Sequence, residues 1–327
     1  MKKTSIMLMI MVFICITCVF ANGENEQGYP SKDIQFYVNA DAGGGTDSIC
    51  RKITQLAEKQ LGGSFYLVNK PGVADAVGPS LIMAAKPDGY TIGNINYGSA
   101  VTAVYQKIVN DYSMDRLRFI ALVTEECDAI MVSKRVPYRT FGAMIEAAKA
   151  NPGKIKVGDQ GIGSRVYLCV RKIEETYKVK FNKVSYSSSA SQREAMLNGE
   201  IDVAVTSLGD FASLLKSGDA VGVCEFSSIR NATYPTVPTC LESGMGEDFL
   251  SSSFLCIAAP KDIPDAIALK LESAFKVAVE SKEFKDWTAS IGITPHFLDG
   301  QALKKYIGNI QKKDFVALDE LKKQGLI

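Results

Sequence analysis

Residues 34–49 read IQFYVNADAGGGTDSI and place three glycines between two different local patterns. Residues 34 to 39 alternate apolar and polar side chains and are rich in strand formers, which predicts a β-strand. After the glycines, apolar residues recur at helical spacing until the Gly62-Gly63 pair ends the pattern. These residues are Ile49, Ile53, Leu56, Ala57 and Leu61. The stretch therefore predicts a strand, a tight loop and an amphipathic helix.

The same order of strand, loop and helix recurs along the chain. The first part continues with predicted strands at 65–69 and 90–95 and a helix that includes 81–85. The order restarts with a strand at 155–157, the loop 158–164 and a helix from about 166 to 177. Further strands are predicted at 118–132, 181–185, 201–205, 220–226 and 254–258, and further helices at 211–216, 264–281 and 301–322. This alternation indicates two α/β units, each with a mostly parallel sheet.

The N-terminus has the features of a secretory signal over residues 1–21. Lys2 and Lys3 precede an apolar run at 6–20, and Val19-Phe20-Ala21 fits the small residues required at a cleavage site. We therefore expect an exported, periplasmic protein that begins near Asn22. The alternative is lipid attachment at Cys18, although Thr17 is a poor residue before such a cysteine.

Charge and length narrow the function classes. Loss of residues 1–21 removes two lysines and no acid, so the formal charge changes from +1 to −1, and the remaining charges are mixed along the chain. We expect no nucleic-acid partner, because no basic patch is visible. The length of 327 residues exceeds the usual size of one domain and favours two.

Six cysteines follow the leader, and none has the spacing of a metal site. Most have apolar neighbours, which favours buried free thiols, although the exported setting leaves a disulfide open. The single histidine, His296, lies far from the glycine loops, and we expect it at the surface. No catalytic set, metal site or cofactor motif is recognised, so we expect a protein that is not an enzyme.

The glycine loop has the character of an anion site. A glycine loop that opens a helix exposes unpaired N–H groups, and the helix end adds roughly half a positive charge. Gly43-Gly44-Gly45-Thr46 is such a loop, and Gly161-Ile162-Gly163-Ser164 is its counterpart in the second unit. Each loop alone is also typical of a simple turn with an N-cap, and that alternative stays open. Together they predict a clamp that holds one anion from two sides.

Three further polar loops follow predicted strands, at the end of the sheet where open α/β folds bind ligands. They are residues 97–102, 185–190 and 206–210, and all are rich in hydroxyl or small side chains. Each could instead cap a helix. Arg165 and Arg193 lie close to these loops in sequence and either reach a second carboxylate or face solvent.

Taken together, the loops resemble those of the solute-binding proteins of tripartite tricarboxylate transporters, also called the Bug family. The resemblance covers nearly the whole mature chain. It rests on Tyr29-Pro30-Ser31-Lys32, Gly43 to Asp47, Asn69-Lys70-Pro71-Gly72, Lys86 to Thr91, Gly161 to Ser164, Tyr234 to Thr239 and Ala259-Pro260. The chain departs from the family where Arg165 follows the second turn, where Ser187-Ser188-Ser189 replaces Lys-Gly-Gly, and where Ala74-Asp75-Ala76 replaces glycines.

The resemblance implies a two-domain periplasmic-binding-protein fold of the type II kind, with a ligand cleft between the domains. Residues 28–124 would begin the first domain, 125–224 would form the second, and 225–327 would return through a hinge to the first. The ligand-binding residues that it implies are Ala42, Gly43, Gly44, Gly45, Thr46, Asp47, Tyr97, Ser99, Thr102, Gly163, Ser164, Ser185, Tyr186, Ser187, Ser188, Ser189, Ala190, Thr206, Ser207 and Asp210.

The same resemblance implies a function and partners. The protein would capture a small organic carboxylate, such as a dicarboxylate, a tricarboxylate or an acidic amino acid, by closure of the cleft. It would act as a monomer and deliver the ligand to integral-membrane permease subunits. The alternative is an exported carboxylate sensor that acts through a membrane signalling partner.

Overall fold

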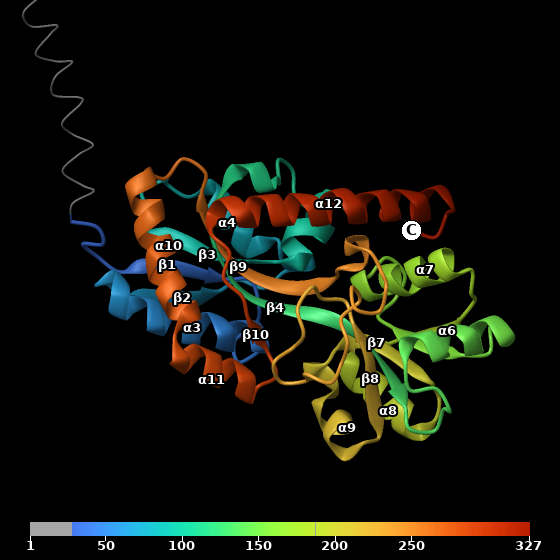
Figure 1. Cartoon of the computed structure of the whole chain (residues 1–327). Helices are drawn as coiled ribbons and strands as arrows, with labels where there is room; N and C mark the ends of the chain where they lie inside the picture. Colours follow the sequence, from blue (N-terminus) through green and yellow to red (C-terminus); the bar gives the residue numbers. More distant parts are fainter. Residues whose placement is uncertain (1–27, 187) are drawn as a thin grey trace, which may run out of the picture.

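The structure is a computed structural model that describes residues 28–186 and 188–327 (Figure 1). The predicted signal peptide, with Cys18, lies outside the described residues. The strands are β1 (Ile34–Val38), β2 (Phe65–Asn69), β3 (Thr91–Asn96), β4 (Leu117–Ser133), β5 (Lys156–Asp159), β6 (Asn182–Ser185), β7 (Val203–Ser207), β8 (Ala220–Glu225), β9 (Ser252–Pro260) and β10 (Thr294–Pro295).

The helices predicted from the apolar spacing are present, together with helices at 141–150 and 282–290 that were not predicted. They are α3 (Gly45–Leu61), α4 (Val77–Ala84), α5 (Ala103–Tyr105), α6 (Phe141–Ala150), α7 (Arg165–Tyr177), α8 (Ser189–Asn198), α9 (Ala212–Ser217), α10 (Asp265–Glu280), α11 (Lys282–Ser290) and α12 (Gly300–Lys323). Short helical turns are η1 (Val73–Asp75), η2 (Gly98–Thr102), η3 (Met114–Arg116), η4 (Gly209–Phe211) and η5 (Glu247–Phe249). Among the described residues, no helix is both long and apolar enough to cross a bilayer.

One sheet runs through the molecule in the order β2-β1-β3-β9-β4-β7-β5-β6, and β8 and β10 also pair with β4. Strand β4 belongs to both halves, because residues 117–127 pair with β9 and residues 128–132 pair with β7. In the first half β9 and the two-residue β10 run against β1, β2, β3 and β4, which are parallel to one another. In the second half only β4 runs against β5, β6, β7 and β8. The prediction of mostly parallel sheets is confirmed.

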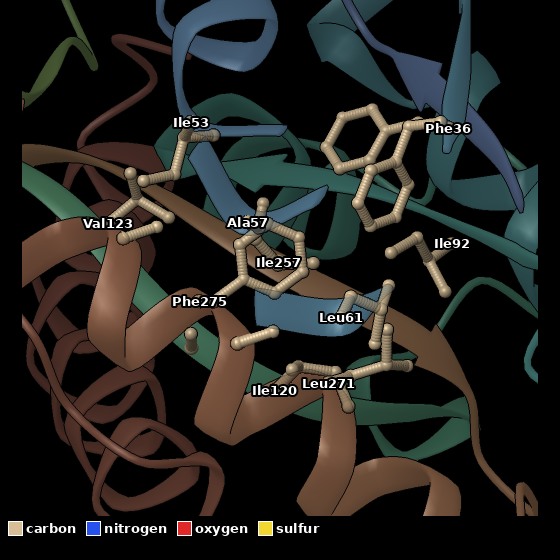
Figure 2. Packing of buried hydrophobic residues seen from close by; sticks show 14 of the residues in the cluster. Phe36, Ile53, Ala57, Leu61, Ile92, Ile120, Val123, Ile257, Leu271 and Phe275 are labelled. Carbon is tan, nitrogen blue, oxygen red and sulfur yellow. The ribbon is translucent and has the colours of Figure 1, made fainter. Parts of the chain in front are cut away.

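The first half has an apolar core on each face of its sheet. On one face, α3 and α10 cover β1, β3, β4 and β9 (Figure 2). The five residues that predicted α3 are all buried there, and Gly62 ends the helix in a left-handed conformation. Each large apolar side chain in this core stabilises the fold by about 1.5–3 kcal/mol. On the other face, α4 and the first part of α12 cover residues such as Ile95, Leu122 and Cys256.

The second half is built in the same way. Helices α6 and α7 cover one face of the sheet through Ile130, Val132 and their neighbours. Helices α8 and α9 cover the other face around Met131 and Phe211. The cysteines Cys50, Cys127, Cys169, Cys224, Cys240 and Cys256 are all free, and all but the half-buried Cys127 are buried.

The C-terminal helix α12 links the two halves. Figure 1 shows it in red, running from the first half until it lies over α7. Leu303 and Ile307 are buried in the first half, whereas Leu318 and Leu321 pack against Tyr167 and Leu168 of α7. The two halves therefore share a strand, β4, and a helix, α12. The domain limits 124/125 and 224/225 stay a prediction.

Candidate functional site

The N-terminal end of α3 is open. No side chain caps the helix at Gly44, so the first N–H groups, those of Gly45, Thr46 and Asp47, have neither a helical acceptor nor a capping oxygen. Gly43 has a φ of +82°, a conformation that glycine adopts without strain. A Cβ placed on Gly43 or Gly45 would meet no atom within 4 Å. The exposed loop can therefore offer several donors to an anion.

Asp47 shapes this loop from beneath. Its side chain is buried and accepts hydrogen bonds from the backbone N–H of Gly43 at 2.9 Å, from Arg51 Nε at 2.8 Å and from Asn69 Nδ2 at 2.9 Å. Burial alone would raise the pKa of Asp47, but these hydrogen bonds and the Arg51 charge together lower it. Since its carboxylate is already committed, Asp47 holds the glycines in place instead of offering an atom to a ligand.

The second glycine loop is built differently from the first. Ser164 caps α7, because its hydroxyl accepts a hydrogen bond from the N–H of Tyr167 at 3.2 Å. Asp159 is fully buried beneath the loop, where its Oδ1 accepts hydrogen bonds from Gly161 N at 2.8 Å and Ser185 Oγ at 2.7 Å. Gly163 lies beside α12 and the C-terminus, with a built Cβ 3.8 Å from Leu318 and 3.6 Å from Ile327. Ser164 therefore has the capping role that the sequence left open.

Several of the predicted hydroxyl residues also bond within their own loops. Ser99 is fully buried and accepts a hydrogen bond from Asn96 N at 3.0 Å. Thr206 donates to Asp210 Oδ2 at 2.6 Å, and Ser207 accepts from Asp210 N at 3.2 Å. Ser188 caps α8. The residues left at least partly exposed without such a role are Ala42, Thr46, Thr102, Tyr186, Ser189 and Ala190. Ser187 lies outside the described residues.

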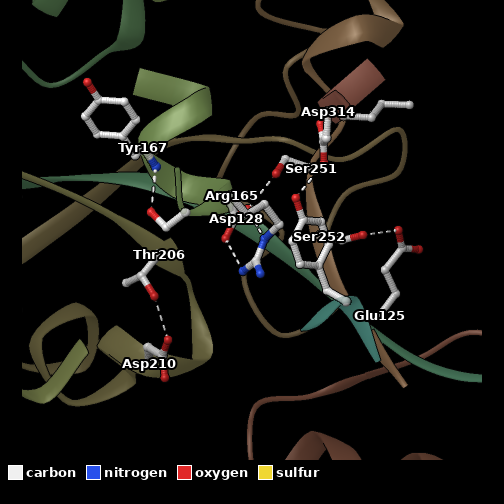
Figure 3. Close-up of polar contacts among 12 residues, drawn as sticks. Glu125, Asp128, Arg165, Tyr167, Thr206, Asp210, Ser251, Ser252 and Asp314 are labelled. Carbon is white, nitrogen blue, oxygen red and sulfur yellow. Dashed lines mark hydrogen bonds and ion pairs between the residues drawn. The ribbon is translucent and has the colours of Figure 1, made fainter. Parts of the chain in front are cut away.

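Where the two halves meet, Arg165 binds Asp128 (Figure 3). Arg165 Nε and Nη2 donate to the two oxygens of Asp128 at 2.6 and 2.8 Å, and Ser251 Oγ donates to Asp128 at 2.7 Å. The Asp128 carboxylate is fully buried. The Arg165 guanidinium also lies 5.3 Å from the ring centroid of Tyr97, whose hydroxyl donates to Asp314 Oδ2 at 2.6 Å. Arg165 thus joins the second half to the β3 loop and α12 of the first.

A cavity of about 460 Å³ lies next to this ion pair. It is lined by Tyr97, Arg165, Tyr306, Lys313 and residues 225–231. Glu125 is also in its wall, and accepts hydrogen bonds from Tyr306 at 2.7 Å and Ser252 at 2.9 Å. His296 Nδ1 lies 2.6 Å from the same carboxylate. The prediction that His296 is a surface residue holds only in part, because its side chain is 40% exposed but paired.

Glu126 is a second residue near the junction that sequence reasoning missed. Burial and the neighbouring Asp210 carboxylate raise the pKa of Glu126 to about 7, against the opposing effect of Arg165. A half-buried carboxylate with so high a pKa marks a poorly solvated, negatively charged environment. Within residues 28–186 and 188–327, no group of three His, Cys, Asp or Glu side chains is arranged as metal ligands would be.

Comparisons with known proteins agree with this architecture. The sequence profile of the family described as "Tripartite tricarboxylate transporter family receptor" matches residues 49–322. A relative from Cupriavidus necator, "UPF0065 protein in gbd 5'region", is 25% identical over 293 residues, which cover 90% of this chain and 88% of the relative.

Two solved structures share the fold. A TctC solute binding protein from Polaromonas superposes with a TM-score of 0.82 at 24% identity, over 90% of this chain and all of that one. MatC from Rhodopseudomonas palustris, solved with bound malate, superposes with a TM-score of 0.65 at 21% identity, over 88% of this chain and 99% of that one. The predicted two-part α/β fold of solute-binding proteins is thereby confirmed.

Proposed function

This chain belongs to the tripartite tricarboxylate transporter receptor family, and we propose that it is an exported receptor that captures a small organic carboxylate and delivers it to membrane permease subunits. The capture site that we propose lies between the two halves of the molecule, with the glycine loop of α3 on one side. In this proposal the loops at 97–102, 163–164 and 206–210, with Ser185, Tyr186 and residues 188–190, complete the wall.

The open end of α3 is the observation that carries this proposal. Its uncapped N–H groups and the helix dipole favour a carboxylate without a buried arginine, whose desolvation would be costly. Arg165 at the junction is bound to Asp128 on two of its nitrogens. The backbone amides of α3 have no such partner, and we propose them as the main anion donors. The malate in MatC, a protein of the same fold, supports a carboxylate as the class of ligand.

Closure of the two halves would follow from a ligand that touches both. Such a ligand interacts fully only with the closed arrangement and shifts the population towards it. Strand β4 passes from one half to the other between Cys127 and Asp128, so bending there would bring the loops together. The ligand-bound form would then be the one that the permease subunits recognise.

Thermal unfolding of the mature protein tests the proposal, with mono-, di- and tricarboxylates and amino acids each at about a millimolar. A ligand of micromolar affinity stabilises the native state by about 4 kcal/mol at a thousandfold excess, which gives a shift of several degrees. A selective shift with one class of carboxylate is the expected result. No shift with any of them, in protein freed of carried-over ligand, would contradict the proposal.

Gly44→Val locates the site. Gly44 has ordinary extended dihedral angles and the nearest atom to a built Cβ is 3.4 Å away, so valine fits the fold but covers the end of α3. We expect at least a tenfold loss of affinity with little change in stability. Gly142→Val is the control, because Gly142 is an exposed glycine in the first turn of α6 with open space around it. Equal affinity in the two variants would remove α3 from the site.

A further inference from the structure

Helix α12 is attached to the first half along most of its length. Its N-terminal part buries Leu303 and Ile307 in that half. Further along, the Tyr105 ring packs on Phe315, with 5.4 Å between the ring centroids. Three hydrogen bonds tie the same part of the helix to the segment that follows β3. They are Gln311 Nε2 to Ala100 O at 2.6 Å, Tyr97 OH to Asp314 Oδ2 at 2.6 Å and Tyr105 OH to Asp319 Oδ1 at 2.9 Å. Because α12 is one continuous helix of 24 residues, we expect it to move with the first half.

Helix α7 of the second half packs against the C-terminal end of α12, and we call this the α7–α12 contact. Its apolar part is closely packed, because each member is at most 8% exposed. The members are Tyr167 and Leu168 of α7 and Leu318 and Leu321 of α12. At its rim, Arg171 Nη1 donates to Gln324 Oε1 at 3.0 Å. Since α12 moves with the first half, this contact joins the two halves.

The α7–α12 contact and the proposed site lie on opposite sides of the hinge. In the first half, α3 covers one face of the sheet and α12 covers the other. Figure 1 shows α12 and α7 together on one side of β4, with α8 and α9 on the other side. Strand β4 passes from one half to the other between Cys127 and Asp128. Bending there towards the end of α3 would therefore move α7 away from α12.

In this structure the α7–α12 contact is formed while the end of α3 is open. Residues 41–45 are exposed. Among the described residues, no hydrogen bond or ion pair joins the glycine loop at 42–46 to residues 128–225 of the second half. Separation of the four buried side chains would expose their apolar surface to water, which is unfavourable. The contact therefore stabilises the open arrangement, and a ligand that closes the site has to overcome it.

From this arrangement we propose that the α7–α12 contact is an autoinhibitory brace, which holds the two halves apart at the proposed site and so lowers the affinity for the ligand. The inference rests on the proposed function and concerns the regulation of the same site. When the binding-competent form is a minor one, the apparent affinity falls in proportion to the fraction of molecules that adopt it. A looser brace raises that fraction, so it should tighten binding even though it destabilises the fold.

One substitution on each side of the brace tests the proposal. Leu168→Ala shortens an apolar side chain on α7, and Leu318→Ala shortens one on α12. The mature proteins are titrated in a calorimeter with succinate, citrate, L-glutamate and the panel member that shifts unfolding most. Each variant should bind the tightest of these probes about threefold more tightly than the wild type, or better. Loss of stability alone would not strengthen binding, so the sign of the change is specific to a brace.

Two controls lie on the same helix. Leu303→Ala also removes a buried leucine side chain, but from the attachment of α12 to the first half. It should lower stability without tightening binding, because the hydrogen bonds of α12 between 311 and 319 remain. Val316→Ala alters a side chain that is 59% exposed and should leave the affinity unchanged.

Small-angle X-ray scattering gives a second measure of closure. The radius of gyration of the wild type should fall when it is saturated with the tightest probe, because the halves approach each other. Without any probe, Leu318→Ala should already have a smaller radius of gyration than the wild type. Val316→Ala should match the wild type in both conditions.

The possible results are distinct. If a probe binds the wild type, the brace is overturned unless both Leu168→Ala and Leu318→Ala bind it more tightly, and the carboxylate receptor stands. Equally tight binding by Leu303→Ala, or a radius of gyration that does not change on saturation, would also overturn the brace. If no probe binds and no member of the wider carboxylate panel shifts unfolding, the proposed function is refuted and this inference falls with it.

Discussion

Arg165→Met should be strongly destabilising, because it leaves the Asp128 carboxylate buried without its counter-charge. The Asp128 side chain has no exposed surface and Arg165 is 18% exposed, with two hydrogen bonds of 2.6 and 2.8 Å between them. Removal of one partner from such a pair costs about 3–5 kcal/mol. Since Ser251 still donates to Asp128, we expect about 3 kcal/mol, measured by urea unfolding followed by circular dichroism.

The cause of that loss can be separated from loss of side-chain bulk. The double variant Asp128→Asn with Arg165→Met removes the buried charge, so it should be more stable than Arg165→Met alone. Arg171→Met is the control on the same helix, because Arg171 is 16% exposed, much like Arg165, but its partner Glu175 is 54% exposed. No buried charge is left alone there, so this change should cost at most about 1 kcal/mol. The reasoning is refuted if Arg165→Met behaves like this control, or if the double variant gains nothing.

Three further substitutions test other parts of the account. Glu126→Gln should flatten the dependence of stability on pH. The pKa of Glu126 is raised from 4.5 to about 7 in the folded protein, so the wild type should lose on the order of 2–3 kcal/mol of stability as the pH rises between those values. If the stability of variant and wild type changes in parallel from pH 5 to 8, the assignment is contradicted. Leu318→Ala should cost about 2–3 kcal/mol, because Leu318 is buried in the α7–α12 contact, whereas Val316→Ala on the same helix, 59% exposed, should cost at most about 0.5 kcal/mol. Gly44→Val should weaken carboxylate binding at least tenfold and spare stability, with Gly142→Val unaffected in both respects.

The regular elements could be predicted from the sequence because their signals are local. The apolar spacing of α3 and the alternation in β1 reflect the faces that these elements bury. Strand β4 was predicted at 118–132 from a strand-like stretch, and it spans 117–133. The stretch does not reveal that the pairing partner changes from β9 to β7 between Cys127 and Asp128, since pairing depends on residues distant in sequence.

The site was harder to predict, because one hydroxyl or charged residue can cap, pair or bind. Ser164 and Ser188 cap their helices, and no local pattern distinguishes that role from ligand contact. Arg165 and Asp128 are separated by 37 residues, so their pairing became visible only with the fold.

The position of a bound carboxylate tests the central claim most directly. A crystal structure of the protein saturated with the tightest ligand of the panel should place a carboxylate oxygen about 3 Å from the N–H groups of Gly45 and Thr46. It should also show the loops of the second half in contact with the same molecule. A ligand found instead in the cavity beside Tyr306 and Lys313, with the end of α3 unoccupied, would contradict the account.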